Sequence, residues 1–288
     1  MIAEWFMTIS AALGLQSTPA PIAASTKWVV DHTDTSCRAT RTFGLGDDIA
    51  TLIITTVPTQ SNLTLSLVLP QAGSARGHDQ WGSATVVLSP SEQKAVTRYH
   101  LVRLAEGARF YLSMQRAAVS ELGSSTEIAL DVGQKRSLAL TSMPSAMRAL
   151  DGCEKNFLAG WGVGTDPEGL PAVFATPKDR MVPTAFGPDA YPADAVAGKV
   201  EGLAVALLSI DTMGKVSACG IASSSGSASL DRATCRAFMG HGAIFNPARD
   251  AHGGAIASKL VMPVTWTSPA HADRAEAEEP ASIIVTSI

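Results

Sequence analysis

Short runs of Val, Ile, Leu and Thr, separated by Gly, Pro, Asp and Ser, fill the chain from residue 28 to about residue 140. Apolar runs bounded by turn-forming residues are typical of successive β-strands. The clearest of these runs span 49–57, 63–69, 84–88, 110–115 and 128–130. The pattern therefore predicts a β-rich domain in the first half of the chain.

The pattern changes at residue 142. Ser142 and Pro144 are typical of the N-cap and the first turn of a helix. Apolar residues then recur at helical spacing as far as Trp161. We predict a helix over 142–161 that closes the β-rich domain, and we assign residues 27–161 to that domain.

Between residues 200 and 266 the pattern predicts two strands, a helix and a third strand. The apolar runs 200–210 and 215–222 flank a turn and indicate a hairpin. Ser229 can cap a helix that extends to about His241. In the last strand the alternation places five apolar residues on one side. They are Ile256, Leu260, Met262, Val264 and Trp266.

The remaining segments connect or flank the two domains, and two domains agree with the length of the chain. Six prolines lie between 162 and 192 without a sustained period, so we predict an extended linker at 162–189 that keeps the domains apart. Residues 268–288 are predicted to be a solvated acidic tail.

The N-terminal segment 1–26 is a candidate signal peptide. Residues 2–15 are apolar, and small residues at 20–24 offer a cleavage site. Glu4 stands where a positive charge is expected, so a misplaced start and a short helix packed on the domain stay open as alternatives. No other run reaches the roughly 20 apolar residues that span a bilayer, and no transmembrane anchor is expected. Export by this imperfect signal predicts a periplasmic or cell-envelope location.

The four cysteines suggest disulfides, because an even number in an exported chain is compatible with an oxidising compartment. Dividing them between the two domains pairs Cys37 with Cys153 and Cys219 with Cys235. For the second pair, two free thiols and a metal site with nearby histidines remain alternatives. The spacing of these cysteines and histidines fits no standard zinc finger.

Other chemistry finds little support in the sequence. The formal net charge is −4 and no basic run occurs, so no nucleic-acid partner is expected. The serines at 223–225 lack the spacing of a nucleophile elbow, and the acidic residues at 31, 34, 47 and 48 lack the spacing of a calcium loop. We therefore expect no catalytic residue, no metal site and no cofactor, so the chain is not expected to be an enzyme.

A series of residues between 190 and 267 resembles the TonB C-terminal family. The series comprises Tyr191-Pro192, Ala195, Gly202, Asp211, Gly214, Ser224-Ser225-Gly226, Leu230-Asp231, Phe245, Pro247-Ala248 and Gly254. The resemblance implies a ββαβ domain at 190–267, in which a three-stranded antiparallel sheet packs on one helix. The expected fold class is thus α+β, with this domain following the N-terminal β-rich domain closed by its helix.

The resemblance further implies that the last strand lies at a sheet edge and accepts an extended peptide from a partner. Pro263 agrees with this, because proline lacks an N–H and favours edge strands, although a bulge is an alternative. The residues expected to bind the partner alternate along this strand. They are Ile256, Ser258, Leu260, Met262, Val264 and Trp266.

The partner implied by the resemblance is a protein, and an outer-membrane TonB-dependent receptor is the candidate. The expected role is that of an energy-transducer-like envelope protein in transport-related interactions. The sequence shows neither the uncleaved membrane anchor nor the long, charged, proline-rich spacer expected of an energy-transducing TonB, which puts coupling to an inner-membrane motor in doubt. An enzyme with its site in the N-terminal domain and a structural or peptidoglycan-associated protein remain as alternatives.

Overall fold

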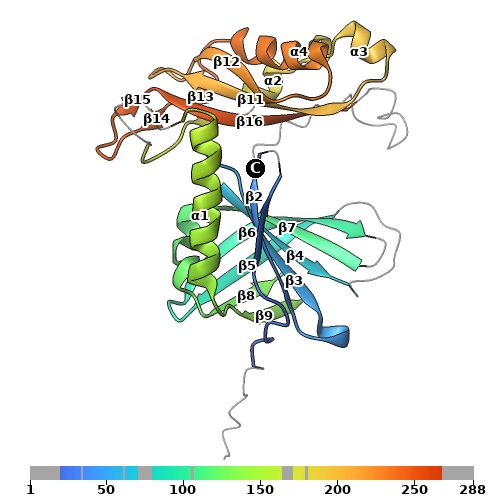
Figure 1. The fold of residues 1–288 in the computed structure, drawn as a ribbon, viewed down its shortest axis with the longest axis vertical. Helices are drawn as coiled ribbons and strands as arrows, with labels where there is room; N and C mark the ends of the chain where they lie inside the picture. The colour runs from blue at the N-terminus through green and yellow to red at the C-terminus, as the bar shows by residue number, and fades with distance from the viewer. Residues whose placement is uncertain are drawn as a thin grey trace, which may run out of the picture.

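The computed structural model describes residues 20–33, 35–60, 62–70, 80–104, 107–163, 171–178 and 181–267. The apolar run of the predicted signal peptide, Asp34 and the predicted acidic tail lie outside these residues. Figure 1 shows two units, a curved sheet with a long helix beside it and a smaller unit at one end of that sheet.

Nine antiparallel strands form the sheet of the first unit, in the order β1-β2-β3-β4-β7-β6-β5-β8-β9. Alternating buried and half-buried residues along β2 and β3 turn one face of the sheet toward a core. The five runs predicted as strands correspond to β3, β4, β5, β7 and β8. The strand bounds are β1 Val29–His32, β2 Cys37–Phe43, β3 Ala50–Thr56, β4 Asn62–Leu69, β5 Gln80–Ser89, β6 Gln93–Leu104, β7 Gly107–Gln115, β8 Glu127–Asp131 and β9 Lys135–Ala139.

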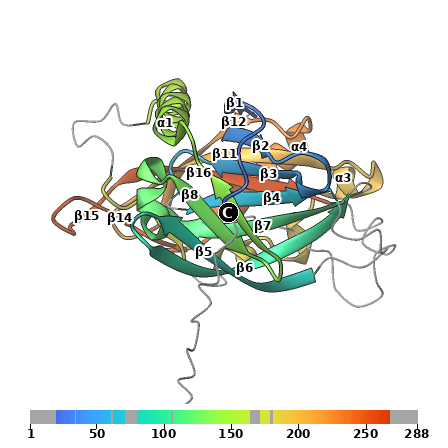
Figure 2. The same cartoon turned by 90° about the horizontal axis from the view of Figure 1, so that it is seen from below.

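The segment from Ile22 to Thr26 joins the two ends of this sheet. The Ile22 amide donates to the Ser137 carbonyl of β9 at 2.7 Å, and the Ser25 amide donates to the Thr42 carbonyl of β2 at 3.0 Å. The sheet therefore curls toward a barrel at this end. Figure 2 shows the strands curving around the core, with the helix along one side.

That helix, α1 (Met143–Gly160), packs on β1, β2 and the 3-10 segment η2 (Arg116–Ser124). The helix predicted at 142–161 is present. Ser142 occupies the predicted N-cap position, but it has a φ of 61° and its side chain makes no capping hydrogen bond. The buried residues of α1 include Met143, Ala146 and Leu150, which extend the core of the sheet.

The second unit contains a three-stranded antiparallel sheet in the order β12-β11-β16, with α4 on one face. Figure 1 shows that α4 lies on the side of this sheet away from the first unit, whereas β11 and β16 face the first unit. The N-cap of α4 is Ser227 rather than the predicted Ser229, and its hydroxyl accepts a hydrogen bond from the Leu230 amide. The bounds are β11 Gly202–Ile210, β12 Val216–Ser223, α4 Ala228–Met239 and β16 Ser258–Trp266.

The described part of the predicted linker is folded onto the second unit rather than extended. α2 (Met181–Ala185) and Phe186, which follows it, place Val182, Ala185 and Phe186 in the core around Phe238. β10 (Thr176–Pro177) pairs with β13 (Phe245–Asn246), and Val173 bridges to Arg249. The predicted linker therefore contains short elements that contribute buried residues to the second core. Two further short helices lead into β11, η3 (Pro188–Ala190) and α3 (Ala193–Ala197).

No helix among the described residues combines the length and the apolar character that crossing a membrane requires.

Candidate functional site

The last strand, β16, lies at an edge of the three-stranded sheet. It pairs with β11 along its whole length, and among the described residues no strand pairs with its other side. Ile256 does not belong to this strand. It lies in β15 (Ala255–Ile256), which pairs with β14 (Ala248–Arg249), so the prediction that Ile256 is part of the last strand is wrong.

The hydrogen bonds of Val261 show which backbone groups of β16 face the open side. The N–H and C=O of Val261 both bond to residues of the first unit rather than to β11. In an antiparallel pair, successive residues direct these groups alternately toward and away from the neighbouring strand. The outward-facing positions of β16 are therefore Lys259, Val261, Pro263 and Thr265. Pro263 lies where its missing N–H removes no bond to β11.

The other residues predicted to bind the partner, from Ser258 to Trp266, occupy alternate positions of β16. Leu260, Met262 and Val264 are 0% exposed and belong to the core under α4. Trp266 is buried with them, and its indole N–H donates to the Thr234 hydroxyl at 2.9 Å. Their side chains are thus not accessible to a partner, and Ser258 is half-buried. A partner at this edge meets the backbone of the odd-numbered residues instead.

The opposite face of the sheet is also covered. Val205 of β11 and Val261 of β16 are 0% exposed, although neither belongs to the core under α4. Figure 1 shows this face turned toward the first unit. The Lys259 ammonium donates to the Gly162 carbonyl, just beyond α1, at 2.7 Å. The two units are therefore in contact at the site that the sequence singled out.

The turn that follows β3 reaches the open edge of β16. The Thr59 hydroxyl accepts a hydrogen bond from the Val261 N–H at 2.9 Å, and the Gln60 amide nitrogen donates to the Val261 carbonyl at 2.7 Å. We call residues 57–60 the edge loop. Sequence reasoning missed this contact, since nothing in the spacing of the two segments indicates that they meet.

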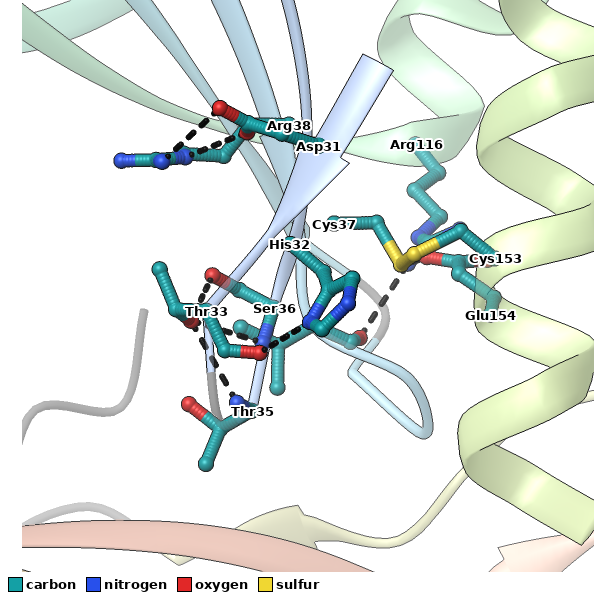
Figure 3. The surroundings of a disulfide bond; sticks show 11 residues. Asp31, His32, Thr33, Thr35, Ser36, Cys37, Arg38, Arg116, Cys153 and Glu154 are labelled. Carbon is teal, nitrogen blue, oxygen red and sulfur yellow. Dashed lines mark hydrogen bonds and ion pairs between the residues drawn. A yellow bond between two sulfur atoms is a disulfide. The ribbon is translucent and has the colours of Figure 1, made fainter. Parts of the chain in front are cut away.

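An ion pair beside a disulfide holds the edge loop in place. Arg116 contacts both carboxylate oxygens of Glu154 on α1, at 3.0 and 2.6 Å, and also donates to the Val57 carbonyl at 3.2 Å. Figure 3 shows this pair next to the bond between Cys37 and Cys153. Cys37 lies opposite Thr56, the last residue of β3 before the edge loop. The disulfide and the ion pair therefore both anchor the base of the loop.

A cavity of about 540 Å³ lies beside the edge loop. Its walls come from the loop itself, the start of η2, α1 and the segment before β10. Pro58, Thr59, Gln60, Arg116 and Glu154 are among the lining residues.

The second predicted disulfide, between Cys219 and Cys235, is also formed in the structure and ties β12 to α4. Asp231 supports the same junction by accepting hydrogen bonds from the Ser224 hydroxyl at 2.6 Å and from the Ser225 hydroxyl and amide at 2.7 and 2.9 Å. Burial opposes the charged form of Asp231, but these hydrogen bonds outweigh it and hold the pKa of the carboxyl below its usual value.

Residues 188–267 match the family model described as the C-terminal of the Gram-negative bacterial TonB protein. The resemblance seen in the sequence is therefore confirmed, and this segment is assigned to the TonB C-terminal domain family. The match covers β11, β12, α4 and β16, and it leaves the first unit unassigned. No curated protein and no solved structure was found to match the chain.

Proposed function

We propose that this chain is a cell-envelope protein that recognises a protein partner by accepting an extended segment of it beside β16. The observation that supports this most strongly is the open side of β16, where alternate backbone groups face away from β11 within a segment assigned to the TonB C-terminal family. A peptide added there gains main-chain hydrogen bonds along an existing sheet.

The chemistry of the edge restricts the kind of partner. Pro263 interrupts the row of outward N–H groups, so the edge offers donors at Lys259, Val261 and Thr265 and acceptors at each odd-numbered carbonyl. The half-buried side chains of Lys259 and Thr265 flank the edge and limit which residues fit. An extended segment from an outer-membrane TonB-dependent receptor is the candidate ligand.

The two disulfides support an envelope location, because such bonds persist in oxidising compartments. The role is one of binding rather than catalysis, and it belongs to transport-related interactions of the envelope.

The experiment uses the full chain and a set of synthetic peptides of about 15 residues, enough to exceed the length of β16, that together cover the periplasm-facing parts of a TonB-dependent outer-membrane receptor. Amide chemical shifts are followed by NMR during titration. We expect saturable changes at Lys259 and Thr265 and at their neighbours in β16. Saturable binding whose shift changes map elsewhere contradicts the proposal.

A matched pair of variants tests the backbone role of the edge. Thr265→Pro removes an outward N–H without breaking the ladder to β11, so it is expected to weaken peptide binding strongly and to leave the fold intact. Thr265→Val keeps the N–H and serves as the control. Equal affinity of the two variants for the peptide would refute strand addition at this edge.

A further inference from the structure

The edge loop occupies the position that a pairing strand would take at Val261. A neighbouring strand accepts a hydrogen bond from the N–H of a residue and donates one to its C=O. The side chains of Thr59 and Gln60 make these same two hydrogen bonds with Val261. Both bonds have normal lengths, and Thr59 is only 3% exposed. The contact is thus a buried substitute for one step of a β-ladder.

A partner strand and the edge loop exclude each other at this point. Paired strands lie roughly 4.8 Å apart, and an added strand would have to run through the space in which Thr59 and Gln60 contact Val261. Val261 is also central among the outward-facing positions of β16. A strand that paired only beyond it, near Thr265, would gain few of the available hydrogen bonds.

The base of the edge loop is anchored, but its tip is a strained turn that borders a cavity. Thr59 has a φ of 73°, in the left-handed region that β-branched residues rarely adopt. The turn is closed by a hydrogen bond from the Gln60 amide to the Val57 carbonyl at 3.1 Å. The cavity lined by Pro58, Thr59 and Gln60 leaves space beside the turn.

We infer that the first unit gates the partner-binding edge. In the unliganded protein the edge loop holds Val261, and a partner strand binds by displacing Thr59 and Gln60 from it. This inference rests on the proposed function, because it names the regulation of the same edge. It also gives the first unit, which has no family assignment, a role in controlling access.

The first test needs no partner. Hydrogen exchange of the Val261 amide is measured by NMR in the full chain and in two variants. Thr59→Val keeps the shape of the side chain and removes the acceptor, and it is expected to speed exchange of this amide roughly five- to tenfold, as the loss of one hydrogen bond predicts. Thr59→Ser keeps the hydroxyl and is expected to exchange at the rate of the unaltered protein.

The Met262 amide is the internal reference, because it faces β11 and should exchange at one rate in all three proteins. Unchanged exchange of Val261 in Thr59→Val overturns the gate, whether or not any peptide binds.

The second test measures whether loss of the edge-loop contacts strengthens peptide binding. The double variant Thr59→Val with Gln60→Met is titrated with the receptor peptide that binds the unaltered chain. We expect its affinity to rise about tenfold or more, as the release of two hydrogen bonds predicts, while Thr59→Ser binds as the unaltered chain does. Equal affinities overturn the gate. If the peptide binds away from β16 in every variant, both the proposed function and the gate are wrong. The exchange rate of the Val261 amide is independent of this result, since it measures only the contact with Thr59.

Discussion

Removing the bond between Cys37 and Cys153 should destabilise the protein more than removing the bond between Cys219 and Cys235. The first pair is separated by 116 residues and the second by 16. A crosslink stabilises chiefly by reducing the entropy of the unfolded chain, and its effect grows with the logarithm of the loop length. The loop lengths correspond to about 5 kcal/mol for the first bond and about 3 kcal/mol for the second.

The assay compares urea unfolding of the paired alanine variants, followed by far-UV circular dichroism. Cys37→Ala with Cys153→Ala is expected to show the larger loss of unfolding free energy. Because Cys37 lies opposite Thr56 and Cys153 precedes Glu154, this variant should also speed amide exchange at Val261. The variant lacking Cys219 and Cys235 is the matched control, since its bond does not touch the edge loop.

The reasoning fails if the shorter crosslink proves the more stabilising of the two. It also fails if the Cys37 and Cys153 variant loses stability while exchange at Val261 stays unchanged, because the disulfide would then have no part in holding the edge loop.

Three further substitutions test individual contacts. Arg116→Met leaves the Glu154 carboxylate without its partner and should lower the unfolding free energy by about 1–2 kcal/mol, whereas a double variant that also carries Glu154→Met should recover part of this in urea titrations. Trp266→Phe removes the bond to the Thr234 hydroxyl and part of the ring, and should lower the unfolding free energy by about 2 kcal/mol in the same assay. The lowered pKa of Asp231 stabilises the fold above its unfolded pKa of about 3.9, and this contribution is lost as pH falls through the folded pKa. Asp231→Asn should therefore lose less stability on acidification than the unaltered protein, and parallel acid curves would contradict this.

The edge strand illustrates what the sequence pattern can and cannot predict. Alternation predicts the strand itself, and the family resemblance implies its place at an edge, with which the missing N–H of Pro263 agrees. The sequence predicts partner contacts at the alternate positions Ser258 to Trp266, but it does not show that most of these side chains are needed for the core. In the structure Leu260, Met262 and Val264 fill the core, and Val261 on the other face is equally buried. When a strand is buried on both faces, its apolar and polar residues do not alternate, so the sequence does not show which side chains face which side of the sheet.

The linker shows a different limit. Frequent prolines predicted an extended spacer, yet Val182 and Phe186 are spaced one helical turn apart and bury their side chains in the second core. The helical spacing of these two residues is visible in the sequence, but the high proline content of the segment favours the prediction of an extended linker. The contact of Thr59 with Val261 is of another kind, since it joins residues about 200 positions apart and depends on how two folded units pack. The predicted pairing of the cysteines is confirmed, because it depended only on each disulfide lying within one unit.

The central claim, that a partner strand adds to β16, is tested most directly by isotope-filtered NOEs between a bound receptor peptide and the backbone protons of the full chain. Strand addition predicts a regular series of NOEs from the peptide to residues 259–265, with Thr59 and Gln60 losing their contacts to Val261. A series to β12 instead, or NOEs confined to side chains of the first unit, would contradict it.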